Sequence, residues 1–145
     1  MVIAMSRQTL SDHPSRRLGL HVLLMDDEEG MLKVTSLLLR RIGCTWRTTT
    51  GGTATLRVYD EAVVSGTPFD AVILDLVVPD DMGGEETARQ LRQRQPVPLL
   101  IGSTGYLDSP VLDNYAAHGF DAVLPKPYRL ADLHRTLSAH PAARV

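Results

Sequence analysis

Short apolar runs alternate with segments of helical period from residue 20 to residue 137, and this alternation constrains the fold more than any other feature. The run LHVLLM at residues 20–25 is apolar apart from His21, which predicts a strand buried on both faces. A helical stripe then carries Met31, Val34, Leu38 and Ile42, and Gly43 stands where that helix would end. The pattern of strand followed by helix recurs along the chain and predicts an α/β protein.

The later segments repeat this pattern. Strands are predicted at residues 45–49, 71–75, 98–102 and 122–124, with helices that end at Gly66, before Pro96 and at Gly119, and a last helix that carries Leu130, Leu133 and Leu137. Ser109 and Pro110 predict an N-cap and a first helical residue. The helix in GEETARQLRQRQ, residues 84–95, is mostly polar, so we expect it to be the most exposed. Right-handed crossovers then predict a flavodoxin-like, doubly wound five-stranded parallel sheet in the order 2-1-3-4-5, with helices on both faces.

The length and the composition of the chain favour one domain. The chain has 145 residues and a formal net charge of −2, so we expect a domain at residues 18–140, a polar leader or linker at residues 1–17 and a tail at residues 141–145, and no binding to nucleic acid. The single cysteine, Cys44, excludes an internal disulfide framework and is expected to be buried. No apolar run approaches the ~18 residues that cross a bilayer, which predicts a cytoplasmic protein without direct membrane contact.

Polar side chains collect where four of the predicted strands end. Asp26 and Asp27 follow the first strand, Asp75 ends the third, Thr104 follows the fourth after Ser103, and Lys126 follows the fifth. Because the carboxyl ends of parallel strands meet at one edge of the sheet, these groups should converge.

Three carboxylates facing one lysine leave an excess of negative charge. An oxygen-rich site of this kind suits Mg²⁺, which bridges carboxylates to phosphoryl groups. Lys126 and Thr104 could bind phosphoryl oxygens, and Asp75, the innermost carboxylate, is the candidate nucleophile that forms an aspartyl phosphate. Taken singly, Asp26 and Asp27 would be read as helix caps, Thr104 as a turn residue, Lys126 as a solvated side chain and Asp75 as a strand-end residue bonded to loop amides.

These motifs resemble the receiver domain of two-component response regulators over about residues 18–140. The similarity is carried by MDDEE after the first strand, ILDLVVP around Asp75, STGY around Thr104 and LPKPY around Lys126. The spacings between these motifs agree with the family. The chain looks most similar to receivers at the C-terminus of hybrid sensor histidine kinases.

The resemblance implies a function and a set of residue roles. Asp75 would accept a phosphoryl group from a phosphohistidine on a histidine kinase or a histidine phosphotransfer protein. The metal ligands implied for Mg²⁺ are Asp27, Asp75 and the backbone carbonyl of Val77, with Asp26 acting mostly through water. Thr104 and Lys126 would then bind the phosphoryl oxygens.

The resemblance also implies features away from the phosphoryl site. The peptide bond between Lys126 and Pro127 would be cis. Phosphorylation would remodel the face formed by the helix near residues 110–119, the strand at 122–124 and the last helix, a face through which the protein could form a homodimer. The chain differs from the common pattern at Val123, where the family often has an aromatic residue, in the acidic loop DDMG after Pro79, and at Pro125.

Two other functions share some of these features. A haloacid-dehalogenase-like phosphatase also uses an aspartate at a strand end, but it needs a second acid two positions later, where this chain has Val77. A receiver-like adaptor that is never phosphorylated would keep only the fold, and the complete set of acid, hydroxyl and lysine argues against it. The sequence contains no G-x-G-x-x-G or G-K-[ST] loop of a nucleotide-binding enzyme.

Overall fold

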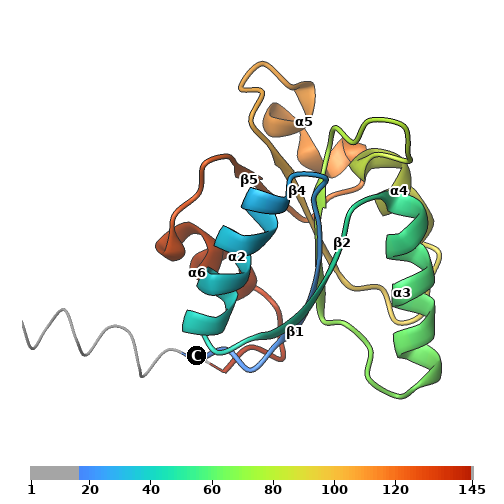
Figure 1. Cartoon of the computed structure of the whole chain (residues 1–145), viewed down its shortest axis with the longest axis vertical. Helices are drawn as coiled ribbons and strands as arrows, with labels where there is room; N and C mark the ends of the chain where they lie inside the picture. The colour runs from blue at the N-terminus through green and yellow to red at the C-terminus, as the bar shows by residue number, and fades with distance from the viewer. Residues whose placement is uncertain (1–16, 145) are drawn as a thin grey trace, which may run out of the picture.

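Five parallel strands form one sheet in the order β2-β1-β3-β4-β5 (Figure 1), as predicted. The computed structural model describes residues 17–144. The strands are β1 (His21–Met25), β2 (Thr45–Thr49), β3 (Ala71–Asp75), β4 (Leu99–Thr104) and β5 (Ala122–Pro125). The register pairs Leu23 of β1 with Val72 of β3, and Ile73 with Ile101 of β4. This is a flavodoxin-like fold.

Helices cover both faces of this sheet. The helices are α2 (Glu29–Arg41), α3 (Gly52–Val64), α4 (Gly84–Leu91), α5 (Pro110–Asp113) and α6 (Leu130–Leu137), with a 3₁₀ helix η1 at Tyr115–His118. Helices α2 and α6 lie on one face and α3 and α4 on the other (Figure 1). Among the described residues, no helix has the length and apolar character needed to cross a membrane.

Alternate side chains of the central strands supply the two cores. Leu23, Val72 and Leu100 point toward α3 and α4, where Tyr59 and Leu91 are fully buried. Val22, Ile73 and Ile101 point the other way, toward Leu39 of α2 and Leu133 of α6. Because both faces are covered, β1 and β3 are continuous apolar runs. The predicted burial of the first strand and of Cys44, which is 6% exposed, is confirmed.

The fourth strand is longer than predicted. PLLIG was expected to end at Gly102, whereas β4 continues through Ser103 and Thr104. The extension exists because β4 is a central strand: Ser103 pairs with Asp75 on one side and with Leu124 on the other. Thr104 is therefore held within the sheet and not in a turn.

The prediction that the helix at residues 84–95 is the most exposed one is wrong. Helix α4 ends at Leu91, before Pro96 as expected, and Gly84, Thr87, Ala88 and Leu91 are buried. The composition was misleading because the buried residues are mostly small. The Thr87 hydroxyl donates a hydrogen bond to the carbonyl of Gly83 at 2.8 Å, so it is satisfied locally while it packs.

The helix predicted at residues 110–119 is interrupted. Ser109 is its N-cap, as expected, and accepts a bond from the Val111 amide. Helix α5 nevertheless ends at Asp113, because Asn114 has non-helical angles, φ −142° and ψ 54°. Asparagine side chains compete with the helix for backbone hydrogen bonds, so it is a natural breaking point. The segment ends at Gly119, where φ is +91°, as predicted.

The described ends of the chain lie together. The amide of Arg144 donates to the carbonyl of Leu18 at 2.9 Å, and Leu18 itself is fully buried. The described part of the predicted tail is thus packed against the start of the domain. The predicted leader, residues 1–17, lies outside the described residues except for Arg17.

Candidate functional site

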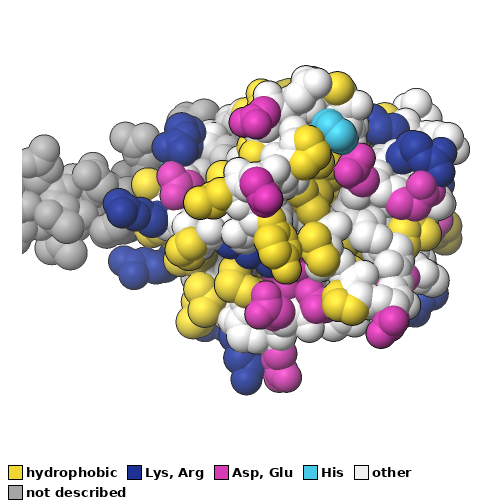
Figure 2. Space-filling model, turned by 90° about the horizontal axis from the view of Figure 1, so that it is seen from above, with side chains coloured by type: hydrophobic (Ala, Val, Ile, Leu, Met, Phe, Trp, Pro, Cys, Tyr) yellow, Lys and Arg dark blue, Asp and Glu magenta, His cyan; other side chains and the backbone are white. Residues whose placement is uncertain are grey.

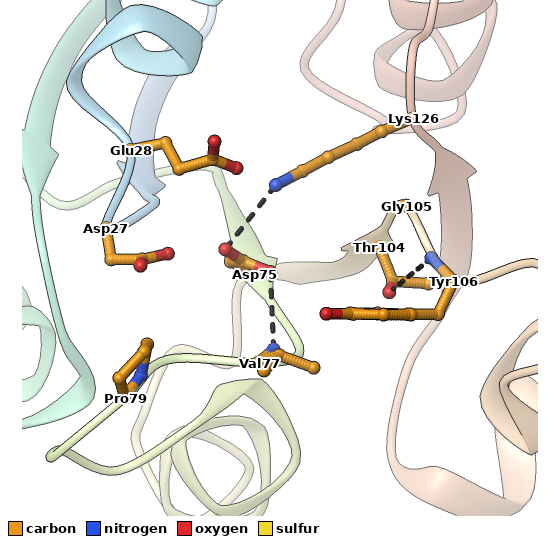
Figure 3. A pocket seen from close by; sticks show the side chains of 9 residues that line it. All are labelled: Asp27, Glu28, Asp75, Val77, Pro79, Thr104, Gly105, Tyr106 and Lys126. Carbon is orange, nitrogen blue, oxygen red and sulfur yellow. Dashed lines mark hydrogen bonds and ion pairs between the residues drawn. The ribbon is translucent and has the colours of Figure 1, made fainter.

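The carboxyl ends of β1, β3, β4 and β5 open into one cleft of about 340 Å³ (Figure 3). The sequence predicted this convergence. The residues that line the cleft are Asp27, Glu28, Asp75, Val77, Pro79, Thr104, Gly105, Tyr106 and Lys126. The cleft therefore contains Asp75, Thr104 and Lys126, the three residues predicted to carry the chemistry.

The predicted acids come together at the floor of the cleft. Asp26, Asp27 and Asp75 each bring one carboxylate oxygen within 4.8 Å of the others. Asp26 and Asp75 are 4% and 5% exposed, whereas Asp27 is exposed. Two of these carboxylates are thus removed from water, which makes an additional positive charge favourable at this point.

The pKa of Asp75 reflects its burial and the charges around it. The pKa of Asp75 is raised to about 7, chiefly by burial; the Lys126 ammonium opposes this rise and the nearby Asp26 carboxylate adds to it. The Val77 backbone amide donates a hydrogen bond to Asp75 Oδ1 at 3.2 Å, and this bond lowers the pKa of Asp75 in part. Burial therefore disfavours the ionised form of Asp75, and a cation bound beside it would favour that form.

Lys126 is shared between two acids. Its ammonium nitrogen lies 2.8 Å from Asp26 Oδ2 and 3.4 Å from Asp75 Oδ2. Burial alone would lower the pKa of Lys126, but Asp26 and Asp75 raise it above its usual value. The Lys126–Pro127 peptide is cis, and the Lys126 amide donates to the Thr104 carbonyl at 2.8 Å, so the lysine is anchored beside β4.

The two hydroxyls at the end of β4 have different roles. Ser103 Oγ donates to the carbonyl of Leu124 at 3.0 Å, so it joins β4 to β5. Thr104 Oγ1 accepts a bond from the Tyr106 amide at 3.1 Å. Because a hydroxyl that accepts can still donate, Thr104 keeps its proton available to a group in the cleft.

Three lining residues were not assigned to the site from sequence. Glu28 lines the cleft and makes no side-chain cap bond, and its backbone amide donates to Asp26 Oδ1 at 2.9 Å. Pro79 and Gly105 are the other two, and the loops after β3 and β4 carry them into the cleft. Their position depends on loop conformation, for which the sequence has no periodic signal.

One side of the mouth of the cleft is apolar. The Tyr106 ring extends across the opening toward Val77 (Figure 3), and these residues are 62% and 50% exposed. Figure 2, viewed from this end of the sheet, shows hydrophobic and acidic side chains side by side, with most lysines and arginines at the margin. The cleft is thus a small acidic depression beside exposed apolar side chains.

Comparisons with known proteins agree with this geometry. The response regulator receiver domain matches residues 22–138. Transcription factor SKN7 of Saccharomyces cerevisiae is 29% identical over 131 residues, which are 89% of this chain and 20% of that protein. This chain therefore spans about a fifth of the length of that relative.

Two solved structures extend the comparison. A response regulator receiver protein from Burkholderia phymatum is 31% identical, with a TM-score of 0.70 over 84% of this chain and 98% of that one. The receiver domain of sensor histidine kinase PA1611 from Pseudomonas aeruginosa, which has a magnesium ion coordinated in its active site cleft, is 24% identical, with a TM-score of 0.70 over 83% of this chain and 95% of that one. The family match over residues 22–138, the five-stranded parallel sheet and the acidic cleft lead to one conclusion: this chain belongs to the response regulator receiver domain family of two-component signalling.

Proposed function

We propose that Asp75 accepts a phosphoryl group from a phosphohistidine on a partner histidine kinase or histidine phosphotransfer protein. The observation that supports this most directly is the convergence of Asp26, Asp27 and Asp75 within 4.8 Å, beside the Lys126 ammonium and the Thr104 hydroxyl in one cleft. Nucleophile, cation and hydroxyl donor are the groups that phosphoryl transfer to a carboxylate needs.

The donor set also suits Mg²⁺. The three carboxylates are hard oxygen ligands. Burial is the main cause of the raised pKa of Asp75, and a cation bound beside the carboxylate would stabilise its ionised form. We assign Asp27, Asp75 and the Val77 carbonyl as direct ligands and Asp26 as a ligand acting mostly through water. When bound, the metal ion would offset the negative charge of the phosphoryl oxygens. The magnesium ion in the active site cleft of the PA1611 receiver supports a magnesium site in this cleft.

The chain's own residues then carry the transfer. A carboxylate oxygen of Asp75 attacks phosphorus, the bond from phosphorus to the histidine nitrogen breaks, and its electron pair returns to the imidazole ring. The hydrogen bond that the Val77 amide donates to Asp75 Oδ1 orients the carboxylate. The Thr104 hydroxyl donates a hydrogen bond to one phosphoryl oxygen, and the Lys126 ammonium binds another.

The response would start from these two residues. Thr104 ends β4 and Lys126 follows β5, so movement of either toward a phosphoryl group pulls on the adjoining strands and on α5 and α6. We propose that this face, formed by α5, β5 and α6, is remodelled and could support a homodimer. Val123 is half-buried against the core, so the response at this position involves an aliphatic side chain in place of an aromatic one.

Acetyl phosphate and intact-mass measurement test the proposal. Incubation with Mg²⁺ should add one phosphoryl group to the protein, and EDTA should prevent the addition. Asp75→Asn should remain unmodified, whereas Asp108→Asn, which removes an equal charge from an exposed position, should be modified like the wild type. Turnover of acetyl phosphate without a stable adduct would indicate a phosphatase, and no reaction at all would indicate an adaptor.

A further inference from the structure

The carboxylate of Asp81 caps a helix to which it does not belong. Helix α3 begins at Gly52, its N-cap residue Gly51 has no side chain to offer, and its first turn contains no acidic residue. Asp81, in the loop between β3 and α4, supplies the missing acceptor. Its Oδ1 accepts from the Thr53 hydroxyl at 2.8 Å and from the Thr53 amide at 3.4 Å. An acid at this position satisfies free amides and favours the positive end of the helix dipole.

Backbone contacts reinforce this cap. The Gly52 amide donates to the carbonyl of Met82 at 3.0 Å, and the Met82 amide donates back to Asp81 Oδ1 at 2.6 Å. A Cβ on Gly51 would lie 2.0 Å from Asp81 Oδ2, and one on Gly52 would lie 2.6 Å from the Met82 carbonyl oxygen. The backbone contact at Gly52 leaves no room for a side chain, and a side chain at Gly51 would displace the Asp81 carboxylate from the cap.

The loop is also held at its other end. A Cβ on Gly84 would lie 2.7 Å from the Asp75 carbonyl oxygen, so the start of α4 packs directly on the backbone of the acceptor strand. Between these two contacts lie Val77 and Pro79, which line the cleft, and Asp80, which has a positive φ of 62°. A non-glycine residue in that conformation carries strain that the surrounding contacts must hold.

We propose that Asp81 is a positioning residue for the metal site: by capping α3 it fixes the loop that presents the Val77 carbonyl to the bound cation. The inference rests on the proposed function of the cleft, because a positioned Val77 carbonyl matters only if a metal ion binds there. Asp81 itself is not a ligand, since its carboxylate is bonded to Thr53 and Met82 and does not line the cleft. Its effect is that of a partner that orients a ligand from outside the coordination sphere.

Three variants of the full chain separate positioning from charge. Asp81→Ala removes the cap, Asp81→Asn removes the charge but keeps an oxygen that accepts from Thr53, and Asp80→Asn removes an equal charge from the same loop at a residue for which no side-chain bond is described. Asparagine also tolerates the positive φ at position 80. The measurements are the Mg²⁺ dissociation constant by titration calorimetry and amide hydrogen exchange across residues 76–83.

Asp81→Ala should weaken Mg²⁺ binding about 10-fold and speed exchange in the loop, while the other two variants stay within about twofold of the wild type. At saturating Mg²⁺, Asp81→Ala should again be phosphorylated by acetyl phosphate. Equal weakening in all three variants would mean that Asp81 acts by charge alone, and wild-type affinity in Asp81→Ala would overturn the inference.

The two proposals fail in different ways. A wild type that binds Mg²⁺ but takes up no phosphoryl group would contradict the proposed function and leave the positioning role intact. A wild type that binds no Mg²⁺ would overturn the positioning role of Asp81, whatever the exchange rates of the loop.

Discussion

The ammonium group of Lys126 is bonded to Asp26 at 2.8 Å, closer than the 3.4 Å that separates it from Asp75. The lysine that the sequence assigned to phosphoryl oxygens is thus held by a neighbouring acid in this structure. To reach a phosphoryl group on Asp75 it would have to release part of that contact. Lys126 and a metal ion would also compete for the same carboxylates.

The first prediction follows from this competition. Lys126→Met removes the cation but keeps most of the side-chain volume, so Asp26 and Asp75 are left unpaired in a site with little solvent. Without metal the variant should lose on the order of 2 kcal/mol of stability, whereas its affinity for Mg²⁺ should increase several-fold. Thermal unfolding in EDTA and calorimetric titration measure the two effects. Lower Mg²⁺ affinity in this variant would show that the lysine does not compete with the metal.

The second prediction concerns the charge of Asp75. Asp75→Asn removes one of three mutually repelling carboxylates with little change in shape, so in EDTA its free energy of unfolding should equal or exceed that of the wild type. The wild type should gain about 1.4 kcal/mol at ten times the Mg²⁺ dissociation constant, and the variant less. A variant that melts well below the wild type in EDTA would make Asp75 a structural residue.

The third prediction is the pH dependence of this difference. Because burial raises the pKa of Asp75 to about 7, the folded protein binds a proton more tightly than the unfolded chain does. The protonated acid favours folding below about pH 4, and this contribution is lost as the pH rises toward 7. In EDTA, the free energy of unfolding of Asp75→Asn should therefore rise relative to that of the wild type between pH 4 and 7, by on the order of 2 kcal/mol. A constant difference across that range would mean that Asp75 titrates near its usual pKa.

The fourth prediction concerns the lifetime of the aspartyl phosphate. Val77 and Tyr106 flank the cleft where a hydrolytic water would approach in line, and neither is suited to orient it. Self-dephosphorylation should be slow, and Val77→Asn should accelerate it several-fold. Val34→Asn is a matched control, because Val34 on α2 is 53% exposed, close to the 50% of Val77. Equal decay of all three phosphoproteins, followed by intact mass, would exclude water access at Val77 as the determinant.

The fifth prediction uses Cys44. Burial raises the pKa of its thiol from 9.0 to about 11, which reduces the reactive thiolate in the folded state about 100-fold relative to an exposed thiol. Iodoacetamide at pH 8 should therefore leave the native protein unmodified and label it rapidly in denaturant. Rapid labelling of the native protein would show that the end of α2 opens frequently.

Periodicity identified the strands well and the helices less well. Buried strands such as LHVLLM have an unambiguous apolar signal, and parallel strands place Asp26, Asp75 and Lys126 at one edge by geometry alone. Residues 84–95 misled because a buried helix surface made of glycine, alanine and threonine looks polar in composition. The break at Asn114 depends on a single residue and is invisible to a pattern averaged over two turns.

The site was predictable in its members but not in its internal bonds. Which acid holds Lys126 depends on rotamers and on burial, neither of which the sequence encodes locally. The contact of Asp81 with Thr53 joins two loops far apart in the chain, and each loop is irregular. Such contacts form only once the sheet has brought the two loops together.

The meeting of Arg144 with Leu18 has a practical consequence for how this domain can be handled. Leu18 and Arg144 lie at the end of the sheet where β1 begins, opposite the carboxyl ends of the strands that form the cleft, so a linker or a reporter joined to the domain beside these residues would start away from the reacting face. A protein immobilised through one end would present its cleft to solution. The same arrangement would bring two fluorophores, one placed beside Leu18 and one beside Arg144, within close range, so that an increase in their separation would report unfolding of the domain without disturbing its chemistry.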